Sequence, residues 1–232
     1  MLELRGLVDK RMAEDEDIDE LHNGAPVCIG GWGSRRKPMS LVRADPLQTF
    51  REAPRPIHEP GRPIVTFLCT GNAARSVMGA AMMRAHYGED PPVSVLSGGT
   101  HVLGGQPMSV RTRTALERHG LRDPWHRSHQ LSATDVERSV LIVAMEPDHL
   151  RWIRRIHPGG AAKTGSLKRV ARDLLPGSVD DLALRVAELD LGEIELEAWE
   201  EVVDPGAGQQ RDYNAAADEV AALVAQLTRR LV

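Results

Sequence analysis

Cysteine is scarce in this chain. Two occur among its 232 residues, Cys28 and Cys69. Two thiols cannot build the disulfide framework of a small secreted protein. A cysteine that is kept as a free thiol suits a reducing compartment, so we expect a cytoplasmic protein.

Long apolar runs and a strong charge of either sign are also missing. The longest buried-looking run, Val140 to Met145, is far too short to cross a bilayer, and the first ten residues have no apolar core of the secretory type. The 29 Lys and Arg nearly balance the 33 Asp and Glu, which gives a formal net charge of -4. We therefore expect neither membrane insertion nor nucleic-acid binding.

One short segment combines a cysteine, a turn and a helix start. Ile64 to Leu68 is apolar and β-branched at its start, which is typical of a buried parallel strand, and Cys69 follows directly. Gly71 and Asn72 readily accept a positive φ, so the backbone N–H groups after the cysteine can turn toward one centre. From Ser76 onward apolar residues follow helical spacing, and a helix N-terminus would face the same point. The pattern predicts an anion-binding loop.

The same loop contains a candidate nucleophile. Arg75 offers a planar fork that fits two oxygens of a phosphoryl group. A helix start beside a cation favours the thiolate form of a cysteine, and the Ser76 hydroxyl would donate a hydrogen bond to it. A buried structural thiol is the commoner role of cysteine. Here, however, loop, arginine and helix all converge on Cys69.

These residues resemble those of a known family. The stretch C-T-G-N-A-A-R-S at residues 69–76 is similar to the phosphate loop of the low-molecular-weight protein tyrosine phosphatases, a family shared with some arsenate reductases. Asp204-Pro205 lies near the end of the chain, where this family has an Asp-Pro pair. Ser97 to Thr100, reading S-G-G-T, resembles the family's S-A-G-T segment. The matches follow the family's order from about Arg62 onward.

The resemblance implies a role for each matched residue. Cys69 would attack the phosphoryl group, Arg75 would clamp its oxygens, and Asp204 would act as general acid and then as base. No metal or other cofactor is implied, because the loop itself supplies the positive field. The implied substrate is a phosphotyrosine protein, with a bacterial tyrosine kinase as one such partner. The residues implied to bind phosphate or to support the loop are Thr70, Gly71, Asn72, Ala73, Ala74, Ser76 and Ser97.

Several positions depart from the family pattern. Ala74 stands where many eukaryotic members have a second cysteine, and Glu146 stands where they tend to have aspartate. Gly206 and Ala207 follow the Asp-Pro pair, where many members have aromatic residues that wall the substrate ring. The slot for an aryl group is therefore open or is built from other parts of the chain.

Two alternative functions share the same loop. Arsenate has nearly the size and charge of phosphate, so a single-cysteine arsenate reductase or arsenate-thiol transferase that uses a small thiol is one of them. Thioredoxin-coupled reductases need two further cysteines, and this chain has one other, Cys28, outside the matched region. A non-catalytic phosphate-binding module is the second alternative. It is disfavoured because nucleophile, arginine and acid are all present.

Alternation of strand-like and helical stretches predicts an α/β fold. The resemblance implies a three-layer sandwich: a four-stranded parallel sheet with helices on both faces and the phosphate loop after the first strand. We expect Tyr213 to Leu231 to form a packing helix and Gly98 and Gly99 to form a turn. Residues 1–61, with an acidic run and several prolines, are predicted to be a flexible extension, and residues 62–232 a catalytic domain. The sequence does not indicate an oligomeric state.

Some conspicuous residues are expected to be structural. His126 and His129 lie three positions apart, but no further ligand stands at metal-binding spacing, so the sequence predicts no zinc site. Trp125 and Trp152 are expected to pack in the core or at its rim, which is the commoner role of tryptophan.

Overall fold

A parallel sheet forms the centre of the molecule. The computed structural model describes residues 49–56 and 59–232. Within them, one sheet has four parallel strands in the spatial order β3 (Ser94–Gly99), β2 (Ile64–Cys69), β5 (Ser139–Ala144) and β6 (Thr164–Ser166). Every side chain of β2 is buried, which explains its continuous apolar sequence.

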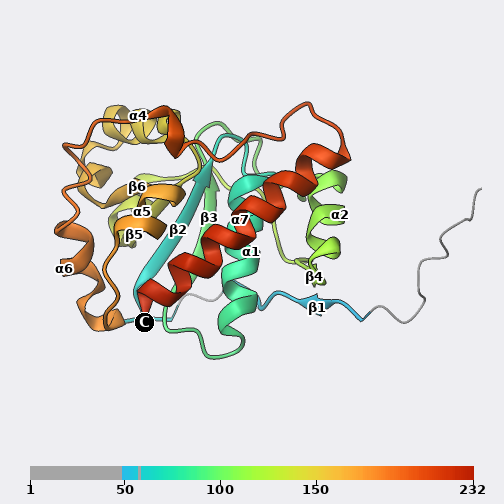
Figure 1. Cartoon of the computed structure of the whole chain (residues 1–232), viewed down its shortest axis with the longest axis horizontal. Helices are drawn as coiled ribbons and strands as arrows, with labels where there is room; N and C mark the ends of the chain where they lie inside the picture. The colour runs from blue at the N-terminus through green and yellow to red at the C-terminus, as the bar shows by residue number, and fades with distance from the viewer. Residues whose placement is uncertain (1–48, 57–58) are drawn as a thin grey trace, which may run out of the picture. The chain divides into compact units, whose positions relative to one another are not determined.

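Helices cover both faces of this sheet. Alternate side chains of β2 point to opposite faces, so Phe67 joins one core cluster and Leu68 the other. The first face is covered by α1 (Arg75–Tyr87), α2 (Val110–Arg118), α5 (Leu167–Asp173), α6 (Leu182–Ala187) and α7 (Gln210–Leu231), with α7 crossing α1 (Figure 1). The second face is covered by α3 (Ala133–Arg138) and α4 (Pro147–Ile156). The expected three-layer α/β fold is confirmed.

The strand order creates a natural position for a binding site. The chain passes from β2 to β3 on one side and later returns to β5 on the other side of β2. Loops at the carboxyl ends of the two neighbouring strands therefore diverge and leave a crevice, where open α/β sheets bind ligands. Cys69 is the last residue of β2 and so lies at this point.

Short elements complete the described chain. They are β1 (Arg51–Glu52), β4 (Leu121–Arg122) and the 3-10 helices η1 (Pro158–Lys163), η2 (Val179–Asp181) and η3 (Ala198–Glu200). In the part of the chain that the structure describes, no helix combines the length and apolar character needed to cross a membrane. The predicted terminal helix is observed as α7, whose inner face includes Val220 and Leu227.

Two expectations differ from the structure. Gly98 and Gly99 are not a turn; they end β3 and pair with Leu68 and Cys69. Part of the predicted extension packs on the domain, because β1 pairs in parallel with β4. The rest of the predicted extension, residues 1–48 and 57–58, lies outside the described residues.

Candidate active site

The loop after β2 surrounds a thiol with hydrogen-bond donors. Cys69 is 4% exposed, and its Sγ lies 2.9 Å from the Ser76 Oγ in the first turn of α1. No side chain caps the N-terminus of this 13-residue helix, and its first turn contains no acidic residue. The first N–H groups of α1 are therefore available to an anion, and the helix dipole favours negative charge there.

Asn72 fixes the shape of the loop. It adopts a φ of +48°, as expected from its place beside Gly71. Its side-chain Nδ2 donates to the Ser76 Oγ at 3.0 Å, and its Oδ1 accepts from the His129 backbone N–H at 2.9 Å. Asn72 thus connects the Ser76 hydroxyl, which lies beside Cys69, to the segment that contains His129.

Two further residues hold the loop, and neither role could be predicted from the sequence. His126 Nε2 donates to the Asn72 carbonyl at 2.9 Å, and Thr112 Oγ1 donates to the Ala73 carbonyl at 2.8 Å. Burial lowers the pKa of His126, which keeps its ring neutral and its role structural. Neither residue stands near the loop in the sequence, so only the folded chain reveals these contacts.

The end of β3 lies close against the same loop. A Cβ on Gly99 would stand 2.6 Å from the Thr70 carbonyl oxygen and 2.9 Å from the Asn72 nitrogen. The backbone N–H groups of Thr100 and His101 donate to the Cys69 and Thr70 carbonyls, each at 3.0 Å. Gly99 therefore permits an approach of two backbones that any larger residue would obstruct.

Arg75 is buried among acceptors at the opening of the loop. Its side chain is 2% exposed, and Nη1 and Nη2 donate to the two Glu146 carboxylate oxygens at 3.0 and 3.2 Å. Nη1 also donates to the Val202 carbonyl at 3.1 Å. Burial alone would lower the pKa of Arg75, but the hydrogen bond and charge of Glu146 outweigh it and raise the pKa. The guanidinium is thus held charged and in a fixed plane.

Glu146 is the centre of a partly buried chain of polar contacts. His149 Nε2 lies 3.0 Å from Glu146 Oε1 and 3.0 Å from Thr70 Oγ1. The His149 hydrogen bond, followed by that of Arg75, lowers the pKa of Glu146 to about 2 although burial opposes this. The contacts therefore run from Arg75 through Glu146 and His149 to the residue that follows the cysteine.

Asp204 reaches the loop from the segment before α7. Its Oδ2 lies 3.0 Å from Arg75 Nη2, and its Oδ1 accepts from the Gly206 N–H at 3.0 Å. The side chain is 49% exposed, whereas the neighbouring Val202 is fully buried. The structure therefore brings together Cys69, Arg75 and Asp204, which lie far apart in the sequence.

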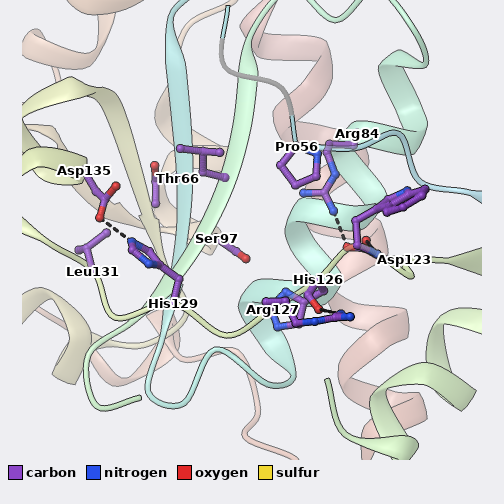
Figure 2. Close-up of a pocket in the computed structure, with 12 residues that line it drawn as sticks. Pro56, Thr66, Arg84, Ser97, Asp123, His126, Arg127, His129, Leu131 and Asp135 are labelled. Carbon is purple, nitrogen blue, oxygen red and sulfur yellow. Dashed lines mark hydrogen bonds and ion pairs between the residues drawn. The ribbon is translucent and has the colours of Figure 1, made fainter. Parts of the chain in front are cut away.

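Ser97 does not join the loop. It lines a separate cavity of about 320 Å³, together with His126 and His129 (Figure 2). Within residues 49–56 and 59–232, no hydrogen bond connects its side chain to a loop residue. The close contact between β3 and the loop comes from Gly99 instead, two residues further along the strand.

The other conspicuous residues have structural surroundings. Trp152 is 9% exposed and packs in the second core cluster with Leu68 and Ile153, as expected. His126 and His129 both contact Asn72 rather than each other. No group of three or more His, Cys, Asp or Glu side chains within the described ranges is arranged to hold a metal ion.

Fold and site together define a class of protein: an α/β protein with a cysteine and an arginine in one oxyanion-binding loop. A family model, described as low molecular weight phosphotyrosine protein phosphatase, matches residues 64–178.

Two named relatives agree with this match. A probable low molecular weight protein-tyrosine-phosphatase, EpsP of Ralstonia nicotianae, is 35% identical over 106 residues, which are 46% of this chain and 69% of that protein. A protein-arginine-phosphatase of Geobacillus stearothermophilus is 29% identical over 167 residues, 72% of this chain and 95% of that protein. The solved YwlE arginine phosphatase of Geobacillus stearothermophilus superposes with a TM-score of 0.58 at 27% identity, covering 72% of this chain and 92% of that one.

The chain belongs to the low molecular weight phosphotyrosine protein phosphatase family, which is a family of phosphoric monoester hydrolases. The resemblance found in the sequence is thereby confirmed. These matches favour phosphatase chemistry over the arsenate alternative.

Proposed function

We propose that this chain hydrolyses phosphotyrosine monoesters of proteins through a phosphocysteine intermediate. The observation that supports this most directly is the convergence of three side chains at one helix N-terminus. Cys69 lies beside the Ser76 hydroxyl, and Arg75 lies 3.0 Å from the Asp204 carboxylate. Nucleophile, oxyanion clamp and proton donor are the three parts that such a reaction needs.

The first step transfers the phosphoryl group to sulfur. The Cys69 thiolate attacks phosphorus, the S–P bond forms, and the bond from phosphorus to the tyrosyl oxygen breaks. Arg75 and the N–H groups of residues 70–76 stabilise the charge on the equatorial oxygens. Protonated Asp204 gives its proton to the departing tyrosyl oxygen. Since Arg75 Nη2 contacts Asp204 in this structure, a bound phosphoryl group would replace that contact and leave the carboxyl group to turn toward the leaving oxygen.

The second step releases phosphate. A water molecule attacks phosphorus and gives its proton to the Asp204 carboxylate, and the S–P bond breaks. The departing thiolate accepts a hydrogen bond from the Ser76 hydroxyl, which is 2.9 Å away. Thr70, Gly71, Asn72, Ala73 and Ala74 supply the loop backbone, and Asn72 holds its shape.

The hydrolysis of phosphoarginine is a second candidate. The arginine phosphatase relative matches along 95% of its length, more than the EpsP relative does. Gly206 and Ala207 carry no aromatic side chain that would select a phenyl ring. Asp204 would then protonate a guanidinium nitrogen rather than a phenolic oxygen.

The release of inorganic phosphate tests this proposal. Three matched peptides carry phosphotyrosine, phosphoserine or phosphoarginine, and Cys69→Ser serves as the blank. We expect Cys69-dependent release from phosphotyrosine and little from phosphoserine. Selective release from phosphoarginine would favour the second candidate, and release that Cys69→Ser retains would contradict both.

The cellular setting is also part of the proposal. A thiolate nucleophile requires reducing conditions, which supports a cytoplasmic location. A tyrosine kinase of the same cell would supply the phosphoprotein substrate. We propose residues 62–232 as the catalytic domain, with residues 49–56 packed against it.

A further inference from the structure

A second hollow lies directly beside the catalytic loop. Its volume is about 410 Å³, and Thr70 and Glu146 form the end nearest the cysteine. Thr70 follows Cys69, and Glu146 binds Arg75, so this end adjoins the proposed reaction centre. The rest of its wall comes from His101 after β3 and from one face of α4.

Aromatic and imidazole rings form the inner part of the wall. Trp152 is buried, and its ring meets the His101 ring edge to face at a centroid distance of 6.4 Å. His149 is 2% exposed, and its Nδ1 has no hydrogen-bond partner within the described residues. The inner wall therefore includes a buried polar atom that no described residue satisfies.

The outer part of the wall carries positive charge. Arg151 and Arg155 lie one helical turn apart on α4 and both line the hollow. Arg151 is paired with the Asp148 carboxylate, and the Glu146 carboxylate is occupied by Arg75 and His149. Arg155 has no carboxylate partner in residues 49–56 and 59–232. One cation at the outer end thus remains uncompensated.

We propose that this hollow is a subsite for an acidic side chain that flanks the phosphotyrosine of a peptide substrate, with Arg155 as its ionic partner. The inference rests on the proposed function, because it requires a phosphopeptide in the loop. A carboxylate fits the free charge of Arg155, because the two carboxylates that also line the hollow, Asp148 and Glu146, are already paired. The subsite would make acidic neighbours of the phosphotyrosine a determinant of substrate choice.

The test compares phosphotyrosine peptides that differ in flanking charge. The parent peptide has glutamine on both sides of the phosphotyrosine, and two variants replace these by glutamate on the amino-terminal or the carboxyl-terminal side. For wild type we expect at least one acidic peptide to have a kcat/KM roughly two- to five-fold above the parent, as for one partly exposed ion pair. Added salt should reduce this ratio, because the pair is accessible to solvent.

Two variants then assign the effect to the hollow. Arg155→Gln should bring the ratio close to one. Arg151→Gln should also lower the ratio below that of wild type, because the Asp148 carboxylate in the hollow would be left unpaired. Arg229→Gln is the matched control: it removes an exposed arginine near the end of α7, a helix that contributes no residue to the lining of the hollow. This control should keep the wild-type ratio.

The possible outcomes distinguish a failure of the subsite from a failure of the proposed phosphatase activity. Equal kcat/KM values for acidic and neutral peptides, or a preference that Arg155→Gln retains, would overturn the subsite and leave the phosphatase activity standing. A failure of wild type to release phosphate from any phosphotyrosine peptide would overturn the proposed function and the subsite with it.

Discussion

Asp204 illustrates how a single side chain depends on its partner in the site. It is nearly half exposed, yet its carboxylate lies 3.0 Å from the buried guanidinium of Arg75. The Gly206 N–H fixes its other oxygen. These contacts hold the Asp204 carboxyl group beside the loop, although the side chain is partly exposed to solvent.

Substitution of Asp204 should affect substrates according to their leaving groups. Asp204→Asn keeps the shape of the side chain but removes the transferable proton, so we expect kcat/KM, which reports the first step, to fall by roughly 10²–10⁴-fold for substrates with poor leaving groups. A nitrophenyl ester, whose leaving oxygen needs no protonation, should lose far less. Steady-state kinetics over a series of aryl phosphates measures this difference. Equal losses throughout the series would remove Asp204 from the role of acid.

Gly99 provides a second prediction at the level of one residue. In Gly99→Ala the new Cβ would stand 2.6 Å from the Thr70 carbonyl oxygen, which is backbone and cannot move aside cheaply. We expect a loss of about 1–3 kcal/mol in the free energy of unfolding, together with a lower kcat from the displaced loop. Urea denaturation and steady-state kinetics test both effects.

Gly104→Ala is the matched control for this change. Gly104 has no atom within 4 Å of its Cβ position, so its substitution should leave both quantities nearly unchanged. Equal effects of the two substitutions would contradict a specific contact at Gly99.

Among single residues, the sequence predicted those members of the site that lie close together in the chain. Cys69, Asn72 and Arg75 are recognisable because strand, turn and helix start are consecutive in the chain. His126 and Thr112 could not be found in this way, since their hydrogen bonds to the loop span 54 and 39 residues. The resemblance of the S-G-G-T segment to the family's S-A-G-T implied a loop contact for Ser97, whereas in the structure Gly99 lies against the loop.

Among the elements, the start of α4 is the one most closely coupled to the loop. Glu146 precedes the helix, Pro147 begins it, and His149 lies in its first turn. The side chains of Glu146 and His149 connect Arg75 to Thr70. The helix thus holds two ends of the phosphate loop at a fixed separation.

This arrangement predicts a dependence of stability on pH. The pKa of Glu146 is lowered from its ordinary value of 4.5 to about 2, first through the His149 hydrogen bond and then through Arg75. The unfolded chain therefore binds this proton more readily than the folded one. The stabilisation is fully present above about pH 4.5 and is lost as the pH falls toward 2.

Urea denaturation between pH 5 and pH 3 measures this effect. Glu146→Gln should show a shallower fall in the free energy of unfolding with decreasing pH than wild type does. Asp148→Asn removes an exposed carboxylate two residues away and should keep the wild-type slope. A slope in Glu146→Gln that equals that of wild type would contradict the account.

The elements themselves could largely be predicted from the sequence. The strands β2 and β5 are short buried runs, and α7 keeps helical periodicity along its length. Gly98 and Gly99 were expected to form a turn, because two adjacent glycines usually break a strand. Here pairing with β2 and the lack of space beside the loop override that local preference.

For the whole molecule, the packing of residues 49–56 against the domain is the main feature that the sequence did not predict. Prolines made residues 51–63 look unstructured, yet Ala53 is fully buried and Arg84 Nε donates to the Pro54 carbonyl at 3.0 Å. The pairing of β1 with β4 joins segments about 70 residues apart, which no local pattern can predict.

Two truncations test this packing. A chain that begins at Asp45 keeps β1, whereas one that begins at Arg62 loses it and exposes the surface beneath Ala53. We expect the shorter chain to have a lower Tm, because the contacts of β1 and the Pro54 carbonyl are lost. Differential scanning calorimetry compares the two. Identical Tm values would mean that residues 45–61 contribute nothing to the fold.

The central claim is that Cys69 becomes phosphorylated during turnover. A phosphotyrosine peptide labelled in its phosphoryl group is mixed with the protein, the reaction is quenched within milliseconds, and the protein is digested and mapped. The account predicts a transient label on the peptide that contains Cys69 and none in Cys69→Ala, which has no nucleophile at this position. Turnover without any labelled cysteine, or a label on another residue, would contradict it.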